Sequence, residues 1–281
     1  MNNSLCQAII YCLLINFFQC QACKAGDLTV ASLELSKIID QQNFVFSKAG
    51  IWSEDEFKQQ AQRIVNLYES FLVENPNEVY ALILYGKFLK KTGHDHEAAD
   101  LFFRADKINP DIAVVKQGIG NFLAENNKYT AAFPFFLNAT QLSDEEPEYH
   151  YNLGSFLYFS KDKIRLPENE QDLDELMHES FRKAANLEPN NFEYQLRFAQ
   201  SFFDYKQSDK TDGLLQWEKL LKSFGDRSIT EVDYLKIGKA RMLIDLEQDK
   251  EAKLLLEAIK TNSLQISKET LLNKLEEDLN K

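Results

Sequence analysis

Three glycines in the middle of the chain, Gly86, Gly120 and Gly154, stand at equal intervals. Other residue types recur with the same period. After Gly86 come Ala98, Phe102, Ala105 and Pro110, and after Gly120 come Ala132, Phe136 and Ala139. A fixed period of about 34 residues is typical of proteins built from stacked supersecondary units. We therefore expect an array of repeats.

The residue types in the repeat explain how one unit packs. Glycine or alanine lets two antiparallel helices approach closely, and phenylalanine fills the space between neighbouring hairpins. Proline ends the second helix because it cannot continue the hydrogen-bond ladder. One helical hairpin cannot bury its own apolar face, so several hairpins must stack into a superhelix.

This pattern resembles the tetratricopeptide-repeat family, whose signature is W-x2-L-G-x2-Y, then A-x3-F, then P, in a helix-turn-helix unit. The match is good from about Val79 to Ser143 and looser onward to about Ile259. In the second copy Lys116 replaces the first aromatic residue and Asp144 replaces the proline. The resemblance implies an all-α fold, an α-solenoid of stacked helix-turn-helix repeats.

We expect the array to span residues 79–262 and to hold four to five repeats. Pro189 follows Gly154 at a longer interval than Pro110 follows Gly86, so the third repeat contains an insertion near residues 160–176. We interpret this insertion as a lengthened turn between the two helices of that repeat. Ala199 and Gly238 are expected at the glycine place of the fourth and fifth repeats.

The segments on either side of the array are expected to be helical as well. Residues 26–78 are interpreted as N-terminal helices with a degenerate half repeat, whose last helix starts with the acidic turn "SEDE". Residues 263–281 are interpreted as a polar-faced capping helix, which an open end of such an array needs.

Residues 1–25 are predicted to be a cleavable signal peptide. Ala8 to Phe18 is an uncharged run, too short to span a bilayer, and small residues suited to signal peptidase follow it, ending at Ala22 or Ala25. The run is preceded by no Lys or Arg, so a retained membrane anchor or a plain N-terminal helix are the alternatives. All four cysteines lie in this segment, so a chain cut after Ala25 forms no disulfide. We expect an exported protein, periplasmic or secreted.

The charge balance excludes some partners. The chain carries 44 acidic and 32 basic residues, a net charge of -12. Nucleic acids and anionic membrane surfaces are bound by basic patches, so we expect no nucleic-acid partner. The uncharged apolar run from Ala8 to Phe18 is too short to span a bilayer, so we also expect no integral membrane span.

Nothing in the sequence forms a catalytic, metal-binding or cofactor-binding motif. There is no Gly-rich phosphate loop and no G-x-S-x-G. His94 and His96 are expected to be exposed turn residues, and His150 a packed ring. His178 stands among acidic residues and is expected on a solvated helix face. We therefore expect a protein that is not an enzyme, with no cofactor and no metal.

The family resemblance implies a protein-protein interaction scaffold, in which the first helices of the repeats line a concave groove that holds a peptide or partner segment. Two alternatives stay open. The chain could be a self-associating structural protein, or it could be an enzyme or the accessory domain of an exported enzyme or assembly complex, with the insertion near Pro167 as a lid.

The groove residues expected from the family's first-helix places follow the spacing i, i+4 and i+7. They are Ile83, Lys87 and Lys90 in the first repeat; Gln117, Asn121 and Ala124 in the second; Tyr151, Ser155 and Tyr158 in the third; and Leu196, Gln200 and Phe203 in the fourth. This lining runs from basic through amide to aromatic and apolar, which suits a segment with an acidic end and a bulky apolar end. Alternatively, the two tyrosines only pack against the lengthened turn.

Some family members grip a terminal carboxylate with a basic clamp. Here Ile83 occupies a place where that clamp has lysine, and only Asn121 is compatible with it. The sequence therefore does not predict that specificity.

Overall fold

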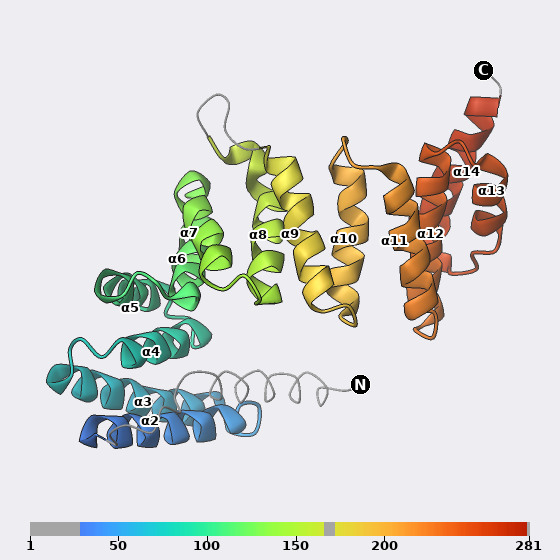
Figure 1. Ribbon diagram of the computed structural model, residues 1–281. Coiled ribbons are helices and arrows are strands. Elements are labelled where there is room, and N and C mark those ends of the chain that lie inside the picture. The colour runs from blue at the N-terminus through green and yellow to red at the C-terminus, as the bar shows by residue number, and fades with distance from the viewer. Residues whose placement is uncertain (1–28, 166–171, 280–281) are drawn as a thin grey trace. The chain divides into compact units, whose positions relative to one another are not determined.

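The computed structural model describes residues 29–165 and 172–279. Every regular element in these ranges is helical, as the ribbon in Figure 1 shows, so the predicted all-α class is confirmed. The predicted signal peptide, residues 1–25, lies outside the described residues, and so does the middle of the predicted insertion, residues 166–171. The chain divides into two compact units, one ending at Thr92 and one beginning at Gly93, which are described separately.

The described part of the first unit, from residue 29 on, contains three helices: α2 (Val30–Ser47), α3 (Glu54–Glu74) and α4 (Val79–Lys91). Helix α3 begins with a capping box, in which Ser53 and Glu56 each bond to the other's backbone N–H. The fully buried Tyr68 of α3 stacks on Tyr85 of α4, with ring centroids 5.1 Å apart. Its hydroxyl donates a hydrogen bond of 2.8 Å to Gln42 of α2, so one aromatic side chain joins all three helices.

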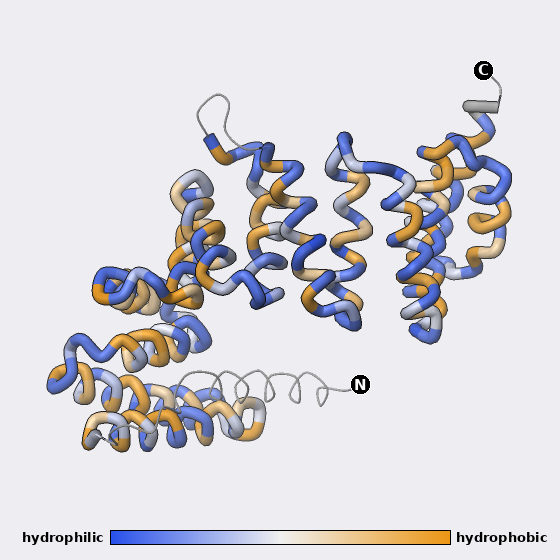
Figure 2. Tube along the Cα trace, viewed as in Figure 1, coloured by the Kyte–Doolittle hydropathy of each residue, from blue (hydrophilic) through white to orange (hydrophobic). Residues whose placement is uncertain are grey.

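The second unit is a row of helices, each packed against the next (Figure 1). They are α5 (Asp95–Ile108), α6 (Ala113–Glu125), α7 (Tyr129–Leu142), α8 (Pro147–Ser160), α9 (Leu173–Leu187), α10 (Phe192–Asp204), α11 (Lys210–Ser223), α12 (Ile229–Asp245), α13 (Asp249–Glu257) and α14 (Gln265–Leu279), with short 3-10 turns at Lys161–Lys163 and Asn262–Leu264. Apolar and polar residues alternate around these helices, as Figure 2 shows, which is expected where each helix is covered by neighbours on some sides only. The unit is an α-solenoid of helical repeats.

Two of the repeated glycines, Gly120 and Gly154, pack against the second helix of their own hairpin. A Cβ atom on Gly120 of α6 would lie 3.1 Å from the ring of Phe136 on α7, and one on Gly154 of α8 would lie 2.8 Å from Phe181 on α9. Phe136 also stacks on Phe156 of α8, with centroids 4.4 Å apart, so its ring joins neighbouring hairpins as the sequence pattern indicates.

The fifth repeat has a different register from the one expected. A Cβ atom on Gly238 would lie 2.3 Å from Trp217, which belongs to α11 of the preceding hairpin. The small residue that packs against the following helix is Ala240, which shares a buried cluster with Ala252 and Leu256 of α13. The assignment of Gly238 to the repeat's glycine place is therefore wrong, and Ala240 holds that place.

The turns between first and second helices support this register. Gly93, Asn127 and Glu247 have positive φ angles of 85°, 59° and 59°. Asn127 follows Gly120 at the same interval as Glu247 follows Ala240. These three chain reversals thus each place one residue in the left-handed region, where glycine and asparagine are tolerated better than glutamate.

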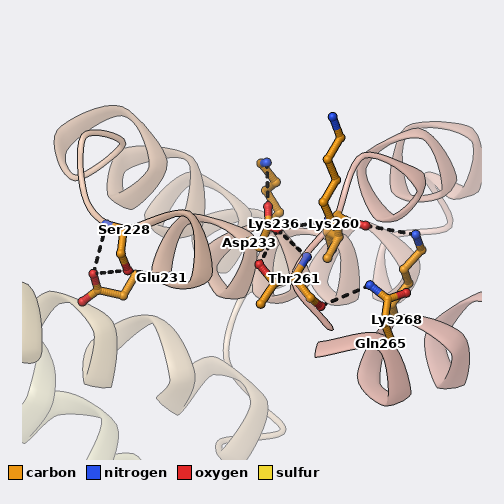
Figure 3. A network of polar contacts seen from close by, with 9 residues as sticks. Ser228, Glu231, Asp233, Lys236, Lys260, Thr261, Gln265 and Lys268 are labelled. Carbon is orange, nitrogen blue, oxygen red and sulfur yellow. Dashed lines mark hydrogen bonds and ion pairs between the residues drawn. The ribbon is translucent and has the colours of Figure 1, made fainter. Parts of the chain in front are cut away.

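A buried carboxylate ties α12 to the C-terminal end of the unit (Figure 3). Asp233 of α12 accepts hydrogen bonds from the backbone N–H groups of Lys260 and Thr261, each 3.1 Å long, and from the Thr261 hydroxyl at 2.7 Å. The ammonium of Lys236 lies 2.9 Å from its other oxygen. Burial acts to raise the pKa of Asp233, but these hydrogen bonds outweigh burial and lower the pKa to about 2.

Candidate functional site

Four side-chain contacts join the first helices α8, α10 and α12 on one face of the second unit. Tyr151 of α8 contacts α10 through Glu193, and Tyr158 of α8 contacts α10 through Arg197. Gln200 and Phe203 of α10 contact α12. We call this surface the aromatic–arginine strip and define it by Tyr151, Tyr158, Arg197, Gln200, Phe203, Tyr234 and Arg241.

At the α8 end of the strip, Tyr151 is held in place by its neighbours. Its hydroxyl donates a 2.6 Å hydrogen bond to Glu193, and its ring lies 4.8 Å from that of Tyr194 and 5.9 Å from that of Phe181. Burial and the hydrogen bond to Glu193 raise the pKa of Tyr151 to about 12. These contacts are with α9 and α10, so Tyr151 both lines the strip and fixes α10 against α8.

Tyr158 is more open to solvent. Its side chain is 38% exposed, and the neighbouring Phe159 is 74% exposed, with the two rings edge to face at 4.9 Å. The guanidinium of Arg197 lies 4.3 Å from the Tyr158 ring centroid, within the range of a cation–π contact. One face of an aromatic pair is therefore available for a partner.

In the middle of the strip, polar contacts run from α10 to α12. Arg197 donates a 2.7 Å hydrogen bond to the side-chain oxygen of Gln200, and the Gln200 amide donates one of 2.8 Å to the Tyr234 hydroxyl. A chain of contacts thus passes from Tyr158 through Arg197 and Gln200 to Tyr234. It holds these side chains in defined positions across three successive repeats.

The α12 end of the strip carries an exposed arginine on an aromatic ring. The guanidinium of Arg241 lies 4.0 Å from the ring centroid of Phe203. Within the described ranges no carboxylate lies at ion-pair distance from Arg241. The partly buried Asp204 lies near enough for its pKa to respond: burial raises it, and Arg197, Lys161 and Arg241 act to lower it.

Beside the strip, a shallow hollow of about 340 Å³ separates α6 from α8. It is lined by Asn121, Ala124 and Glu125 of α6, Tyr129 and Phe136 of α7, and Asn152, Ser155, Phe156, Phe159 and Ser160 of α8. The buried Gln117 donates a 3.1 Å hydrogen bond to Asn121 at its edge. Three predicted groove residues, Asn121, Ala124 and Ser155, therefore line one concavity.

The predicted groove residues of the first and fourth repeats lie on α4 and α10. Ile83, Lys87 and Lys90 lie on α4 in the first unit, with Ile83 buried and Lys87 exposed. Leu196 is partly buried against the core around Trp217 and serves packing. Phe203 packs against the same core but keeps its contact with Arg241.

Sequence reasoning missed Arg197, Tyr234 and Arg241. The signal for Arg241 was present: it follows Ala240 directly, as the predicted Asn121, Ser155 and Gln200 follow the small residue of their repeats. With Gly238 taken as the reference, the same offset gives Lys239, which instead pairs with Glu218 and Glu251.

His178 departs from expectation, since it is buried and not solvated. Its ring lies 4.6 Å from that of Phe202, 5.3 Å from that of Phe198 and 5.5 Å from that of Tyr205, and its Nδ1 is 2.8 Å from the Ser201 hydroxyl. Burial lowers the pKa of His178.

The other histidines agree with the sequence. His150 is buried, with Nε2 2.8 Å from the Asp144 carbonyl, while His94 and His96 are exposed. In the part of the chain that the structure describes, no three His, Cys, Asp or Glu side chains form a metal-ligand group. None of the described helices combines the length and the apolar character needed to cross a membrane.

Fold and surface together define a tetratricopeptide-like α-solenoid, and comparison with solved structures supports this class. The crystal structure of YrrB, described as a TPR protein with an unusual peptide-binding site, matches with a TM-score of 0.56 and 16% identity over 68% of this chain and 89% of that one. PilF of Pseudomonas aeruginosa matches with a TM-score of 0.54 and 16% identity over 86% and 99% of the two chains. MamA of Desulfovibrio magneticus matches with a TM-score of 0.50 and 15% identity over 68% and 97%. No protein-family model matches the sequence, and a search of curated proteins found no relative.

Proposed function

We propose that this protein is a non-enzymatic interaction scaffold that binds an extended segment of a partner polypeptide along the aromatic–arginine strip. The observation that carries the proposal is the chain of contacts from Tyr158 through Arg197 and Gln200 to Tyr234, which crosses three repeats. The description of YrrB as a peptide-binding TPR protein supports a role of this kind for the fold.

The chemistry of the strip suits binding. Tyrosine and arginine are the residue types that most often dominate binding energy at protein interfaces, because they combine large contact area with polar groups. Tyr158 and Tyr234 are each 38% exposed while their polar neighbours hold them in place. A partner therefore meets side chains that lose little further conformational entropy on binding.

Site-specific photo-crosslinking tests the proposal. One variant carries Tyr158→benzoylphenylalanine on the strip, and a matched control carries Leu215→benzoylphenylalanine on the second helix α11, where Leu215 is 57% exposed. After irradiation in cells, we expect a defined partner adduct from position 158 and none from position 215, identified by mass spectrometry. Equal adducts from both positions would contradict the proposal. Adducts only between copies of this chain would favour self-association instead.

We also propose that the protein acts after export, which rests on the sequence of residues 1–25 alone. The prediction is that the mature protein begins after Ala22 or Ala25. Intact-mass measurement of the protein purified from its native host checks this. A full-length mass would favour a retained N-terminal segment.

A further inference from the structure

Two guanidinium groups of the strip are held on aromatic rings. Arg197 lies 4.3 Å from the Tyr158 centroid and 4.7 Å from the Phe181 centroid, and Arg241 lies 4.0 Å from the Phe203 centroid. A guanidinium held on a ring keeps the N–H groups around its edge free to bond with a carboxylate. The rings thus orient both arginines before any partner arrives.

These two arginines differ from others in the same unit. Arg182 is paired with Glu179, and Arg227 is paired with Glu231. Among the described residues, neither Arg197 nor Arg241 has an ion pair, although the chain has 44 acidic residues against 32 basic ones. Because no carboxylate of the described residues pairs with these two arginines, N–H donors of their guanidinium groups are available to a ligand.

The surroundings also limit how much negative charge the ligand carries. Glu193 bonds to Tyr151 at one end of the strip, and Asp204 lies among Arg197, Lys161 and Arg241. A nucleic acid or another dense polyanion would be repelled by these carboxylates and by the net charge of -12. One or two carboxylates placed at the guanidinium groups avoid this repulsion.

Resting on the proposed function, we infer that the strip selects a partner segment in which an Asp or Glu side chain stands close to a large apolar residue. The carboxylate bonds to Arg241, with Arg197 adding to the positive potential. The apolar residue covers Tyr158 and the exposed Phe159, which borders the hollow between α6 and α8. In this proposal the charge selection within the second unit lies on α10 and α12.

Selection from a phage library of random dodecapeptides tests this inference. The protein is used without residues 1–25, in four forms: unchanged, Arg241→Gln, Arg241→Lys, and Arg182→Gln as a control that removes one positive charge elsewhere. We expect selected peptides to be enriched in Asp or Glu two to five places from an aromatic or leucine residue. For a synthetic peptide chosen in this way, Arg241→Gln should weaken binding about tenfold, the usual effect of losing one charge-assisted contact. Arg241→Lys should fall in between, and Arg182→Gln should bind like the unchanged protein.

The outcomes separate this inference from the proposed function. Selected peptides without acidic enrichment, or acidic enrichment that persists in Arg241→Gln, would overturn the inference and leave the scaffold proposal standing. Displacement of the chosen peptide by oligothymidylate would show a general anion site and would also overturn it. If no peptide is enriched by the unchanged protein, both proposals fail. Circular dichroism melting shows whether each variant is folded; Arg241 is exposed, so we expect unchanged melts.

Discussion

Gly238 of α12 packs directly against the indole ring of Trp217 of α11. A Cβ atom on Gly238 would lie 2.3 Å from two of the ring carbons, closer than side-chain carbons approach in folded proteins. Trp217 is 1% exposed and belongs to the core between the two hairpins. This contact sets how closely the fourth and fifth repeats stack.

Replacing this glycine tests the contact. Gly238→Ala should lower the free energy of unfolding by about 1–3 kcal/mol, because the added methyl group forces the buried ring or the helix to move. This loss exceeds the gain of about 1 kcal/mol that alanine brings inside a helix. Urea unfolding followed by circular dichroism measures the difference.

A matched control is Gly213→Ala on α11. There the added Cβ atom lies 2.8 Å from the terminal methyl group of Met242, which is the end of a flexible side chain. We expect a change within about 1 kcal/mol of zero. If Gly238→Ala proves as mild as this control, the close approach of α11 and α12 is wrong.

The register of α12 shows where sequence reasoning stops. The prediction that Gly120 and Gly154 hold the repeat's glycine place is correct. Each of them contacts a ring of its own hairpin, and that contact repeats with the sequence period. In the sequence alone, Gly238 cannot be distinguished from these two glycines. Its contact is with the preceding hairpin, and only the packed structure reveals this. The prediction for His178 fails for a related reason: Phe198 and Phe202 of α10 cover its ring, and this contact between helices is not visible in the local sequence. The strip combines side chains from α8, α10 and α12, so the sequence supplied some members and missed Arg241.

The turn residue Glu247 offers a stabilising substitution. Its φ of 59° is strained for a residue with a Cβ atom, whereas Gly93 occupies the corresponding turn of an earlier repeat without strain. Glu247→Gly should therefore raise the free energy of unfolding by about 1 kcal/mol. Glu247→Ala keeps the Cβ atom and should give no gain. A stabilisation by alanine equal to that by glycine would point to the charge and not to the backbone.

The Asp233 network predicts a large effect from a small change. Asp233→Asn removes the negative charge of a carboxylate that accepts hydrogen bonds from Lys260, Thr261 and Lys236. The substitution should lower the free energy of unfolding by about 2 kcal/mol. The exposed Asp245 of the same helix, whose carboxylate is 3.5 Å from Lys274, is the control, and Asp245→Asn should cost less than about 1 kcal/mol. Chemical unfolding at pH 7 compares the two variants. Equal losses would argue against a structural role for the network.

Asp233 also gives a pH dependence. Its pKa in the fold, about 2, lies below the ordinary value of 3.8, so the folded state favours the ionised form. The corresponding stability is present above about pH 4 and is lost as the pH falls from there toward 2. The Asp233→Asn variant should therefore lose less stability than the unchanged protein over this interval, measured by urea unfolding at each pH.

His178 predicts a pH dependence nearer neutrality. Burial lowers its pKa below the ordinary value of 6.5; Arg182 and Lys210 act in the same direction, and Glu179 acts against them. The folded state thus favours the neutral ring, packed against Phe202 and hydrogen-bonded to Ser201. The stability that this ring contributes is fully present above about pH 6.5. It is lost as the pH falls below that value, because the unfolded chain binds the proton first.

Unfolding free energies measured between pH 7.5 and 5.5 test this difference in His178. We expect His178→Asn, which keeps a partner for Ser201 but cannot titrate, to lose less stability over this range than the unchanged protein. The slopes should differ by at most about 1.4 kcal/mol per pH unit, the value for a single proton. His94→Asn removes an exposed histidine and should leave the slope unchanged, which separates the effect of burial from the loss of any histidine. If the slope of His178→Asn matches that of the unchanged protein, the ring of His178 is as accessible to protons in the fold as in the unfolded chain, and the aromatic packing of α9 against α10 is looser than the structure has it.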